Sequence, residues 1–459
     1  MTEKTSGSGT TLLIVSIVQF FTPYMMSAVG IALPSIGREF QASAFQLGLV
    51  ETAYILGVSI FLVPAGRMAD IKGRKKIYTL GILLFTIATC VIAFSGSIRF
   101  FIVVRFIQGA GASLIVSTSI AILTSVFPPE QRGRAMGIVV ACVYAGLSAG
   151  PGLGGLIVTY FGWRFVFAAV IPFQIITLYL SFFKLKGEWA EAKGEKFDWP
   201  GSIIYMVSLV AMISGAAFIK KDISGYFIMA GGFSGLIFFL VFESFIKFPV
   251  LNVKLLRYNR VFALSNLATM INYASSFGIT FLFSLYLQTT KGLSPKAAGF
   301  VLIVQPLVQS VLSPGAGRLS DRFSSSKIAT IGMGICAFAL FLCSFVDADT
   351  PVYLIYCVLV IMGIGFAVFS SPNMNTVMGS VESRYYGVAA SLVATMRTFG
   401  MLVSMTTVTL IFSVVMGDME VSAKTSSFFV KSMQTAFMLF AGLSVIGVFC
   451  SLGRIKKQV

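Results

Sequence analysis

The sequence predicts an all-α polytopic membrane protein, on the evidence of its composition, its apolar segments and its charge distribution. Hydrophobic residues make up 57% of the 459 positions and charged residues only 11%, and the mean hydropathy is +0.91. Soluble globular domains carry about 25% charged residues, so this composition excludes a soluble globular protein.

Fourteen apolar segments are long enough to cross a bilayer as helices, for which roughly 20 residues are needed. We expect spans at residues 11–33, 45–66, 77–95, 99–122, 134–159, 164–184, 200–219, 225–245, 261–289, 296–317, 328–346, 351–372, 386–415 and 430–452. The first ten residues are polar and no small-residue cleavage site follows the first segment, so we expect that segment to be kept as a span.

The lysines and arginines indicate the orientation of the spans. An even number of spans places both termini on one side, and positively charged loops remain cytoplasmic. Most Lys and Arg residues lie in the termini and in the loops that share their side. We therefore expect a multi-pass protein of the cell membrane with both termini in the cytoplasm. The net charge of +17 then faces anionic lipid, and no nucleic-acid partner is expected.

The cysteines and the absence of histidine argue against metal and cofactor chemistry. All six cysteines lie in apolar segments without metal-ligand spacing, and the chain has no histidine. We therefore expect no metal and no disulfide framework. We also expect no cofactor and no enzyme activity.

A repeated sequence pattern divides the chain into two halves. Pro64 to Asp70 close the second span, and Pro314 to Asp321 close the tenth with a similar pattern. If spans seven and eight are an insertion, each Asp follows the second helix of a six-helix half, as in parallel repeats. The expected parts are an N-terminal six-helix bundle at 1–184, a cytoplasmic linker with two additional spans at 185–260, and a C-terminal six-helix bundle at 261–459.

A glycine-rich stretch interrupts the fifth span. Gly146, Gly150 and Gly154 recur every four residues and form one bare stripe on a helix, beside Pro151 and Gly155. Each interior glycine costs roughly 1 kcal/mol against alanine and an interior proline about 3 kcal/mol. Close approach of a neighbouring helix offsets such costs in lipid. A tightly packed helix pair with no further role explains the spacing equally well.

Three motifs in order resemble the major facilitator superfamily, and within it the fourteen-span drug/proton antiporters of the multidrug efflux type. Gly66 to Lys76 match the signature between helices two and three, Arg105 to Gly111 match that of helix four, and Gly146 to Gly155 match that of helix five. Lesser matches are Trp163-Arg164, Phe197 to Trp199 and Arg397 to Gly400. The resemblance implies two six-helix bundles plus two extra helices, and its helix-five motif goes with export.

The resemblance fails at one position in the first span. Antiporters of this branch usually carry an aspartate nine residues before the proline that ends the helix. Pro34 places that position at Met25, so this chain lacks the aspartate of the usual proton site.

The loop after the second span is a candidate cytoplasmic gate. Asp70 lies at a helix end within reach of Arg67 and Arg74, and Gly73 permits a tight turn. A breakable ion pair there would latch one conformational state; ordinary cytoplasmic charge is the alternative. The gate candidates are Gly66, Arg67, Asp70, Gly73, Arg74, Arg318 and Asp321.

Arg105 is a candidate for proton coupling, because a guanidinium inside a span needs a protein or water partner. Gln108 shares its helical face, and Glu51 in the second span lies at a similar depth. Glu243 lies near a cytoplasmic helix end, where its side chain is expected to reach water. A Glu51–Arg105 pair that opens when Glu51 takes a proton would couple transport to protons. A permanent pair, or a glutamate facing the pore mouth, is the alternative.

Substrate candidates are side chains expected near the midplane between the halves, where transporters of this kind bind their substrates. Soft aromatic and methionine surfaces accept varied apolar ligands, and Arg397 suits an anionic group. Packing or lipid contact is the alternative for each. The candidates are Tyr24, Met25, Tyr144, Asn272, Gln305, Gln309, Asn373 and Arg397.

We therefore expect a secondary active transporter that exports amphipathic or lipophilic compounds in exchange for protons by alternating access. An uptake symporter or exchanger of small organic anions is the alternative, favoured by Arg105 and Arg397 and disfavoured by the glycine stripe. The expected partners are a small-molecule substrate, protons and the lipid bilayer, and we expect a monomer.

Overall fold

The computed structural model describes residues 5–218, 223–251, 253, 256, 259–382 and 386–454, except for the side chains at 5, 6, 129, 130, 217, 321 and 387. Within these residues the regular secondary structure is helical, and no strand forms apart from one isolated bridge between Ser43 and Glu420. The all-α class is therefore confirmed.

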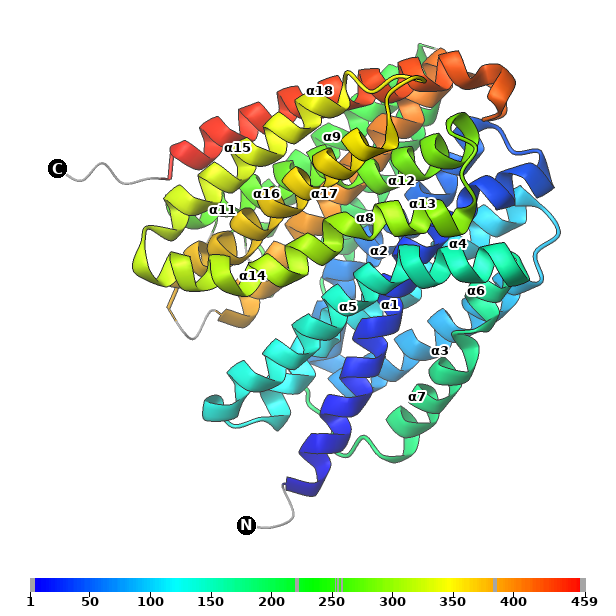
Figure 1. Cartoon of the computed structure of the whole chain (residues 1–459). Coiled ribbons are helices and arrows are strands. Elements are labelled where there is room, and N and C mark those ends of the chain that lie inside the picture. Colours follow the sequence, from blue (N-terminus) through cyan, green and yellow to red (C-terminus); the bar gives the residue numbers. More distant parts are fainter. Residues whose placement is uncertain are drawn as a thin grey trace. The chain divides into compact units, whose positions relative to one another are not determined.

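Fourteen helical spans of the described residues are long and apolar enough to cross a membrane, which confirms the expected number. The helices, in chain order (Figure 1), are α1 (Thr5–Phe40), α2 (Ala44–Lys72), α3 (Arg74–Ala93), α4 (Ile98–Val126), α5 (Pro129–Phe161), α6 (Arg164–Ala168), α7 (Ile171–Phe183), α8 (Trp199–Phe218), α9 (Ser224–Glu243), α11 (Arg260–Ser276), α12 (Gly278–Leu285), a π-helical turn (Tyr286–Thr290), α13 (Pro295–Leu302), α14 (Val304–Arg322), α15 (Ser325–Cys343), α16 (Val352–Gly379), α17 (Tyr386–Val415), a 3₁₀ turn (Ala423–Thr425) and α18 (Ser426–Leu452).

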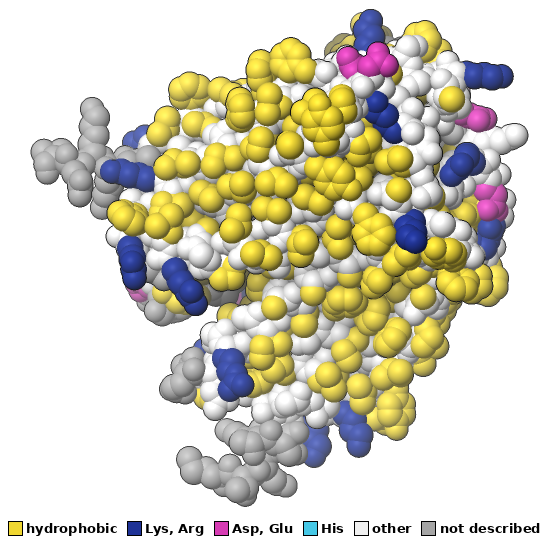
Figure 2. Space-filling view, viewed as in Figure 1, with side chains coloured by type: hydrophobic (Ala, Val, Ile, Leu, Met, Phe, Trp, Pro, Cys, Tyr) yellow, Lys and Arg dark blue, Asp and Glu magenta, His cyan; other side chains and the backbone are white. Residues whose placement is uncertain are grey.

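The surface matches a bilayer environment. Hydrophobic side chains predominate on the face drawn in Figure 2, where charged side chains are few. Large apolar side chains such as Phe94, Phe183 and Phe245 are largely exposed. In water such a surface would be unfavourable, whereas lipid accepts it.

Contacts divide the chain into two compact units. Unit 1 comprises residues 1–29, 49–150 and 160–252, and unit 2 comprises residues 30–48, 151–159 and 253–459. In unit 1, α3 packs on α4, and α8 packs on α9. The Tyr205 hydroxyl of α8 donates to the Ser59 carbonyl of α2 at 2.8 Å, so the α8–α9 hairpin is joined to the first helices.

Unit 2 has its own core, in which α15 packs on α16 and α18, and α11 packs on α17. Its buried centre includes Ile271, Met333 and Phe369. The contact grouping places the added hairpin with unit 1 and parts of α1, α2 and α5 with unit 2. The expected domain boundaries at 1–184, 185–260 and 261–459 stay a prediction.

Candidate functional site

An ion pair lies inside unit 1, between α2 and α4. The two helices approach closely, since a Cβ at Gly57 would clash with the Phe106 carbonyl and one at Gly109 would clash with the Tyr54 carbonyl. This approach brings Glu51 opposite Arg105, with Nη2 of the guanidinium 3.3 Å from Oε2 of the carboxylate. Arg105 has no exposed surface and Glu51 is 3% exposed, so neither charge is shared with water.

The ion pair continues into a chain of neutral polar groups. Nη1 of Arg105 donates to Oε1 of Gln108 at 2.7 Å. Nε2 of Gln108 donates to the Thr89 hydroxyl of α3 at 2.8 Å, and Nε2 of Gln174 of α7 reaches the same hydroxyl at 3.4 Å. Four helices thus contribute to one buried network, which we call the Glu51 network (Glu51, Arg105, Gln108, Thr89 and Gln174).

The Glu51 network keeps unused hydrogen-bonding capacity. Oε1 of Glu51, Nε of Arg105 and Oε1 of Gln174 are buried and have no hydrogen-bond partner among the described residues. The Arg105 guanidinium also lies over the Tyr54 ring, 4.2 Å from its centroid, where the π face favours a cation. An unpartnered carboxylate oxygen is a suitable position for a proton, because protonation there need not first break a hydrogen bond.

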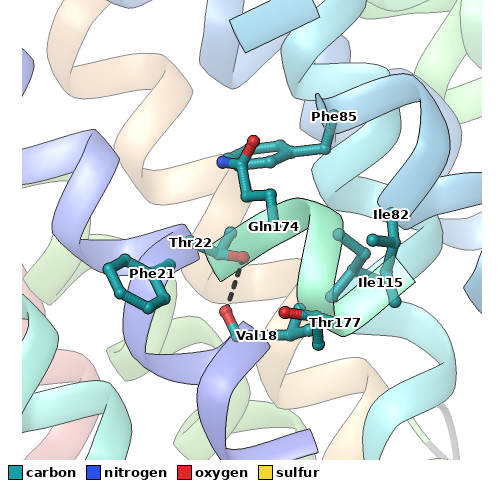
Figure 3. Close-up of a pocket in the computed structure, with 8 residues that line it drawn as sticks. All are labelled: Val18, Phe21, Thr22, Ile82, Phe85, Ile115, Gln174 and Thr177. Atoms are coloured by element: carbon teal, nitrogen blue, oxygen red, sulfur yellow. Dashed lines mark hydrogen bonds between the residues drawn. The ribbon is translucent and has the colours of Figure 1, made fainter. Parts of the chain in front are cut away.

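A small hollow adjoins the far end of the network. Phe21, Phe85, Gln174 and Thr177 are among its lining residues, which come from α1, α3, α4 and α7 (Figure 3). The lining is mostly apolar, and the Thr22 hydroxyl donates to the Val18 carbonyl instead of pointing a free donor into the hollow. It has room for about one water molecule. Drug-sized ligands need several hundred Å³, so the hollow is no substrate pocket.

The gate candidates of unit 1 form a second charged cluster, which centres on Arg74. Its Nη2 lies 2.8 Å from Oδ1 of Asp70, and its Nη1 donates to Oε1 of Glu191 and to the Ser125 hydroxyl, both at 2.8 Å. Gly73 has a positive φ of 114°, which a side chain would disfavour. The expected proximity of Asp70 and Arg74 is thus present.

The connector between α7 and α8 (residues 184–198) supplies the remaining partners. Arg67 pairs with Glu195 of this connector instead of with Asp70. Oε1 of Glu188 accepts the backbone N–H of Lys75 at 3.0 Å. Backbone bonds from Arg74 to Trp189 and from Ala192 to Asp70 complete the contact, at 2.9 and 3.0 Å. The connector therefore covers the turn between α2 and α3, which the sequence analysis did not foresee.

The remaining gate candidates have weaker structural support. Gly66 is half-buried, and a Cβ there would lie 3.7 Å from Ser117. Arg318 is exposed on α14, and the side chain of Asp321 lies outside the described residues. The role of this second Asp-containing turn stays a prediction.

The helix-five motif packs tightly in both units. In unit 1, a Cβ at Gly146 would clash with the Phe20 carbonyl of α1, and one at Gly150 with the Ser27 side chain. In unit 2, a Cβ at Gly155 would clash with the Pro295 carbonyl of α13, and one at Gly299 with the carbonyl of Pro151. Gly154 is buried. A side chain at Gly146, Gly150 or Gly155 would therefore force the packed helices apart.

The substrate candidates are distributed over both units. Tyr24 and Met25 are buried in unit 1, where Met25 has no exposed surface, and Tyr144 is half-buried. In unit 2, Asn272 and Gln309 are buried. Gln305 and Arg397 are half-buried, and no hydrogen-bond partner of the Arg397 Nε is found among the described residues.

Asn373 has a structural partner. Its Oδ1 accepts a hydrogen bond from Nη1 of Arg454, which also donates to the Ser265 hydroxyl at 3.0 Å. Its Nδ2 donates to the Thr269 hydroxyl at 2.8 Å. Burial lowers the pKa of Arg454 to about 10, which leaves the guanidinium charged at neutral pH. Asn373 of α16 thus links Arg454, which follows α18, to α11, and a role in substrate contact stays a prediction.

Neutral polar residues of the network were missed by sequence reasoning. Thr89 and Gln174 stand alone in apolar segments, where threonine commonly bonds its own helix backbone, as Thr89 also does to the Phe85 carbonyl at 2.7 Å. Among the described residues, no group of three or more His, Cys, Asp or Glu could hold a metal ion.

Comparison with known proteins identifies relatives over most of the chain. The family model described as Major Facilitator Superfamily matches residues 15–405 and 265–457. The riboflavin transporter RibZ of Clostridioides difficile is 32% identical over 84% of each chain. The multidrug resistance protein Stp of Mycobacterium tuberculosis is 26% identical over 81% of this chain and 70% of its own length. A crystal structure of a bacterial homologue of the human lysosomal transporter Spinster matches 99% of this chain and all of that chain with a TM-score of 0.72, at 15% identity, and so shows the fold alone.

Proposed function

The chain belongs to the Major Facilitator Superfamily, and from this premise we propose that it exports amphipathic or lipophilic, drug-like compounds in exchange for protons by alternating access. It is a multi-pass membrane transporter and not an enzyme. We further propose that it works as a monomer in the cell membrane of a bacterium, with both termini in the cytoplasm. Its other proposed partners are a small-molecule substrate and protons.

The packing of the helix-five motif is the observation that supports the proposed direction of transport. Its motif is the one that, by resemblance, goes with export. In the structure Gly146 and Gly155 each lie against a backbone carbonyl, on α1 and α13 respectively. Helices whose backbones approach this closely leave no room for water between them. A seal of this kind favours an exchanger, in which the carrier must not leak protons while it changes conformation. The similarity to a multidrug resistance protein agrees with the proposal.

The Glu51 network supplies the proposed coupling step. In one state Glu51 is ionised and held by Arg105, as the 3.3 Å contact describes. A proton on Glu51 removes the charge that Arg105 neutralises, and the guanidinium then keeps Gln108 and the Tyr54 ring as its partners among the described residues. Binding of the proton therefore changes the packing of α2 on α4, and substrate binding in the opposite state would favour its release.

The test is transport in proteoliposomes that hold the purified protein. A panel of dyes, organic cations, organic anions and riboflavin is offered with and without a proton gradient. We expect uphill movement of at least one amphipathic compound out of the compartment that corresponds to the cytoplasm, with counter-movement of protons. Uphill movement without any dependence on the proton gradient would contradict the coupling, and exclusive inward movement would contradict export.

The similarity to RibZ favours a second candidate, a transporter of riboflavin or a related planar heterocycle. The same panel separates the two candidates. Transport of labelled riboflavin would support the second candidate if unlabelled riboflavin suppresses it and the dyes do not. Competition among chemically different dyes would support the first candidate.

A further inference from the structure

The α8–α9 hairpin carries a pair of buried carboxyl groups at its two ends, apart from the Glu51 network. Asp198 precedes α8 and is 8% exposed, and Glu243 ends α9 and is 2% exposed. Glu243 therefore does not reach water, contrary to the expectation from its place near a helix end. Both residues lie in unit 1.

One oxygen of each carboxyl has an ordinary partner. Oδ1 of Asp198 accepts the Gly201 N–H at 3.0 Å and so caps the start of α8. Oε2 of Glu243 accepts the Leu251 N–H at 3.1 Å. Leu251 belongs to the segment that runs from α9 toward α11, so the Glu243 carboxyl also anchors this segment.

The other two oxygens face each other without a donor. Oδ2 of Asp198 and Oε1 of Glu243 both lie in the space that a Cβ at position 201 would fill, and Gly201 leaves that space open. The two carboxyls are within hydrogen-bonding reach of each other. Both oxygens are buried, and no N–H or O–H group of the described residues donates to either.

The basic residues next to the pair along the chain are exposed, and Arg67, which the connector engages, has another partner. Arg67 of α2 pairs with Glu195 of the connector. Lys196 is exposed, and the Lys247 ammonium lies 5.4 Å from the centroid of the Phe248 ring. In the described part of the chain, neither Asp198 nor Glu243 forms an ion pair with a cation.

Two ionised carboxylates in this position would repel each other and would both lack solvent, which costs several kcal/mol. One proton removes the repulsion and supplies the missing hydrogen bond between the facing oxygens. We propose that Asp198 and Glu243 bind a single proton between them and form a proton site that is separate from Glu51. Such a site is independent of the direction and the substrate of transport.

The shared proton ties three segments together. With the proton in place, the start of α8, the end of α9 and, through Leu251, the segment toward α11 are held at one point. When the proton leaves, two negative charges face each other and this point loosens. The stabilisation is therefore present at low pH and is lost as the pH rises, since the folded state holds the proton more tightly than the unfolded chain does.

Infrared difference spectroscopy of the full-length protein during a pH change tests the shared proton directly. The C=O stretch of a protonated carboxyl is measured in the wild type, in Asp198→Asn, in Glu243→Gln and in the double variant. We expect each single variant to lose the C=O signal of one protonated carboxyl. The double variant should lose the signal of one protonated carboxyl as well and not of two, because both residues hold the same proton. Loss of no protonated carboxyl in the single variants, or of two in the double variant, would overturn the proposal. The exposed Asp418 serves as a control, and Asp418→Asn is expected to lose none.

A pair of glycine variants tests the geometry without removing either carboxyl. A Cβ at Gly201 would occupy the meeting point of the two oxygens, whereas one at Gly231 of α9 would meet nothing within 4 Å. We expect Gly201→Ala to lose the protonated-carboxyl signal and the pH dependence of the melting temperature, and Gly231→Ala to keep both. An unchanged protonated-carboxyl signal in Gly201→Ala contradicts the proposal. A second contradicting outcome is a wild type that lacks the signal and whose melting temperature rises when Na⁺ or K⁺ is added. That outcome would indicate a bound cation in place of the proton.

Discussion

In the proposed mechanism Glu51 takes up and releases the coupled proton. Its side chain is buried, its Oε2 lies 3.3 Å from Nη2 of Arg105, and its Oε1 has no hydrogen-bond partner among the described residues. We expect Glu51→Gln to abolish uphill, proton-driven transport and to leave downhill substrate exchange. A glutamine keeps the shape and an acceptor for Arg105 but cannot lose or gain the proton. Substrate-induced proton movement in proteoliposomes is the measurement, and it should fall to the level of empty liposomes. Movement at the wild-type ratio would place the coupling site elsewhere.

Arg105 tests the other side of the same pair. Arg105→Ala leaves the Glu51 carboxyl buried without its cation and removes a donor to Gln108, and loss of one partner of a buried pair costs about 3–5 kcal/mol. We therefore expect a clearly lower melting temperature in detergent than for Glu51→Gln, and partial recovery when both substitutions are combined. Arg99 lies exposed on the same helix, so Arg99→Ala should melt with the wild type. Equal melting of Arg105→Ala and the wild type would show that the pair contributes little to stability.

Helix α5 offers a matched test at the scale of one element. A side chain at Gly150 would meet Ser27 and the Ala28 backbone of α1, whereas one at Gly137 on the same helix would meet nothing within 4 Å. Overpacking of this kind costs about 1–3 kcal/mol. We expect Gly150→Leu to abolish transport while the protein still reaches the membrane, and Gly137→Leu to transport normally. Normal efflux by Gly150→Leu would mean that the close α1–α5 contact serves packing alone.

The connector over the α2–α3 turn is held by ion pairs that are partly exposed, such as Arg67–Glu195. Pairs of this kind contribute about 0.2–1 kcal/mol each. Glu195→Gln should therefore raise the fraction of opened connector, and tryptic cleavage at the exposed Lys193 should become about two- to fivefold faster. Glu188→Gln is the control, because a glutamine still accepts the Lys75 N–H. Equal cleavage of Glu195→Gln and the wild type would show that the backbone bonds hold the connector without this pair.

At the scale of the whole molecule, the number of spans and the meeting of Glu51 with Arg105 could be predicted from the sequence. Span length follows from bilayer thickness, and two charges at similar depth in apolar helices have few other partners. The contact of the connector with the α2–α3 turn could not be predicted, because a polar loop has no periodicity that indicates what it covers. The burial of Glu243 was missed for a related reason, since helix ends usually allow a side chain to reach water and only the fold places Asp198 opposite.

If the protein works by alternating access, the contact between α5 and α13 is expected to open in one state of the cycle. By sequence α5 belongs to the first six-helix bundle and α13 to the second, yet residues 151–159 of α5 group with α13 in unit 2. At this contact the Thr159 hydroxyl accepts the Lys296 N–H at 3.0 Å, and Gly155 lies against the Pro295 carbonyl. Rocking of one bundle against the other must separate these residues in one state of the cycle.

A cross-link between the two segments should therefore stop transport at one state. In a background without the six native cysteines, the double variant Thr159→Cys/Lys296→Cys is expected to cross-link on oxidation, to lose transport, and to regain it on reduction. Each single-cysteine variant should transport normally under the same oxidation, which controls for damage to other side chains. Substrate binding should survive in the cross-linked protein, because only the exchange of states is blocked. If the cross-linked protein transports at the wild-type rate, the α5–α13 contact stays closed throughout the cycle, and the pathway must open without separating these two helices.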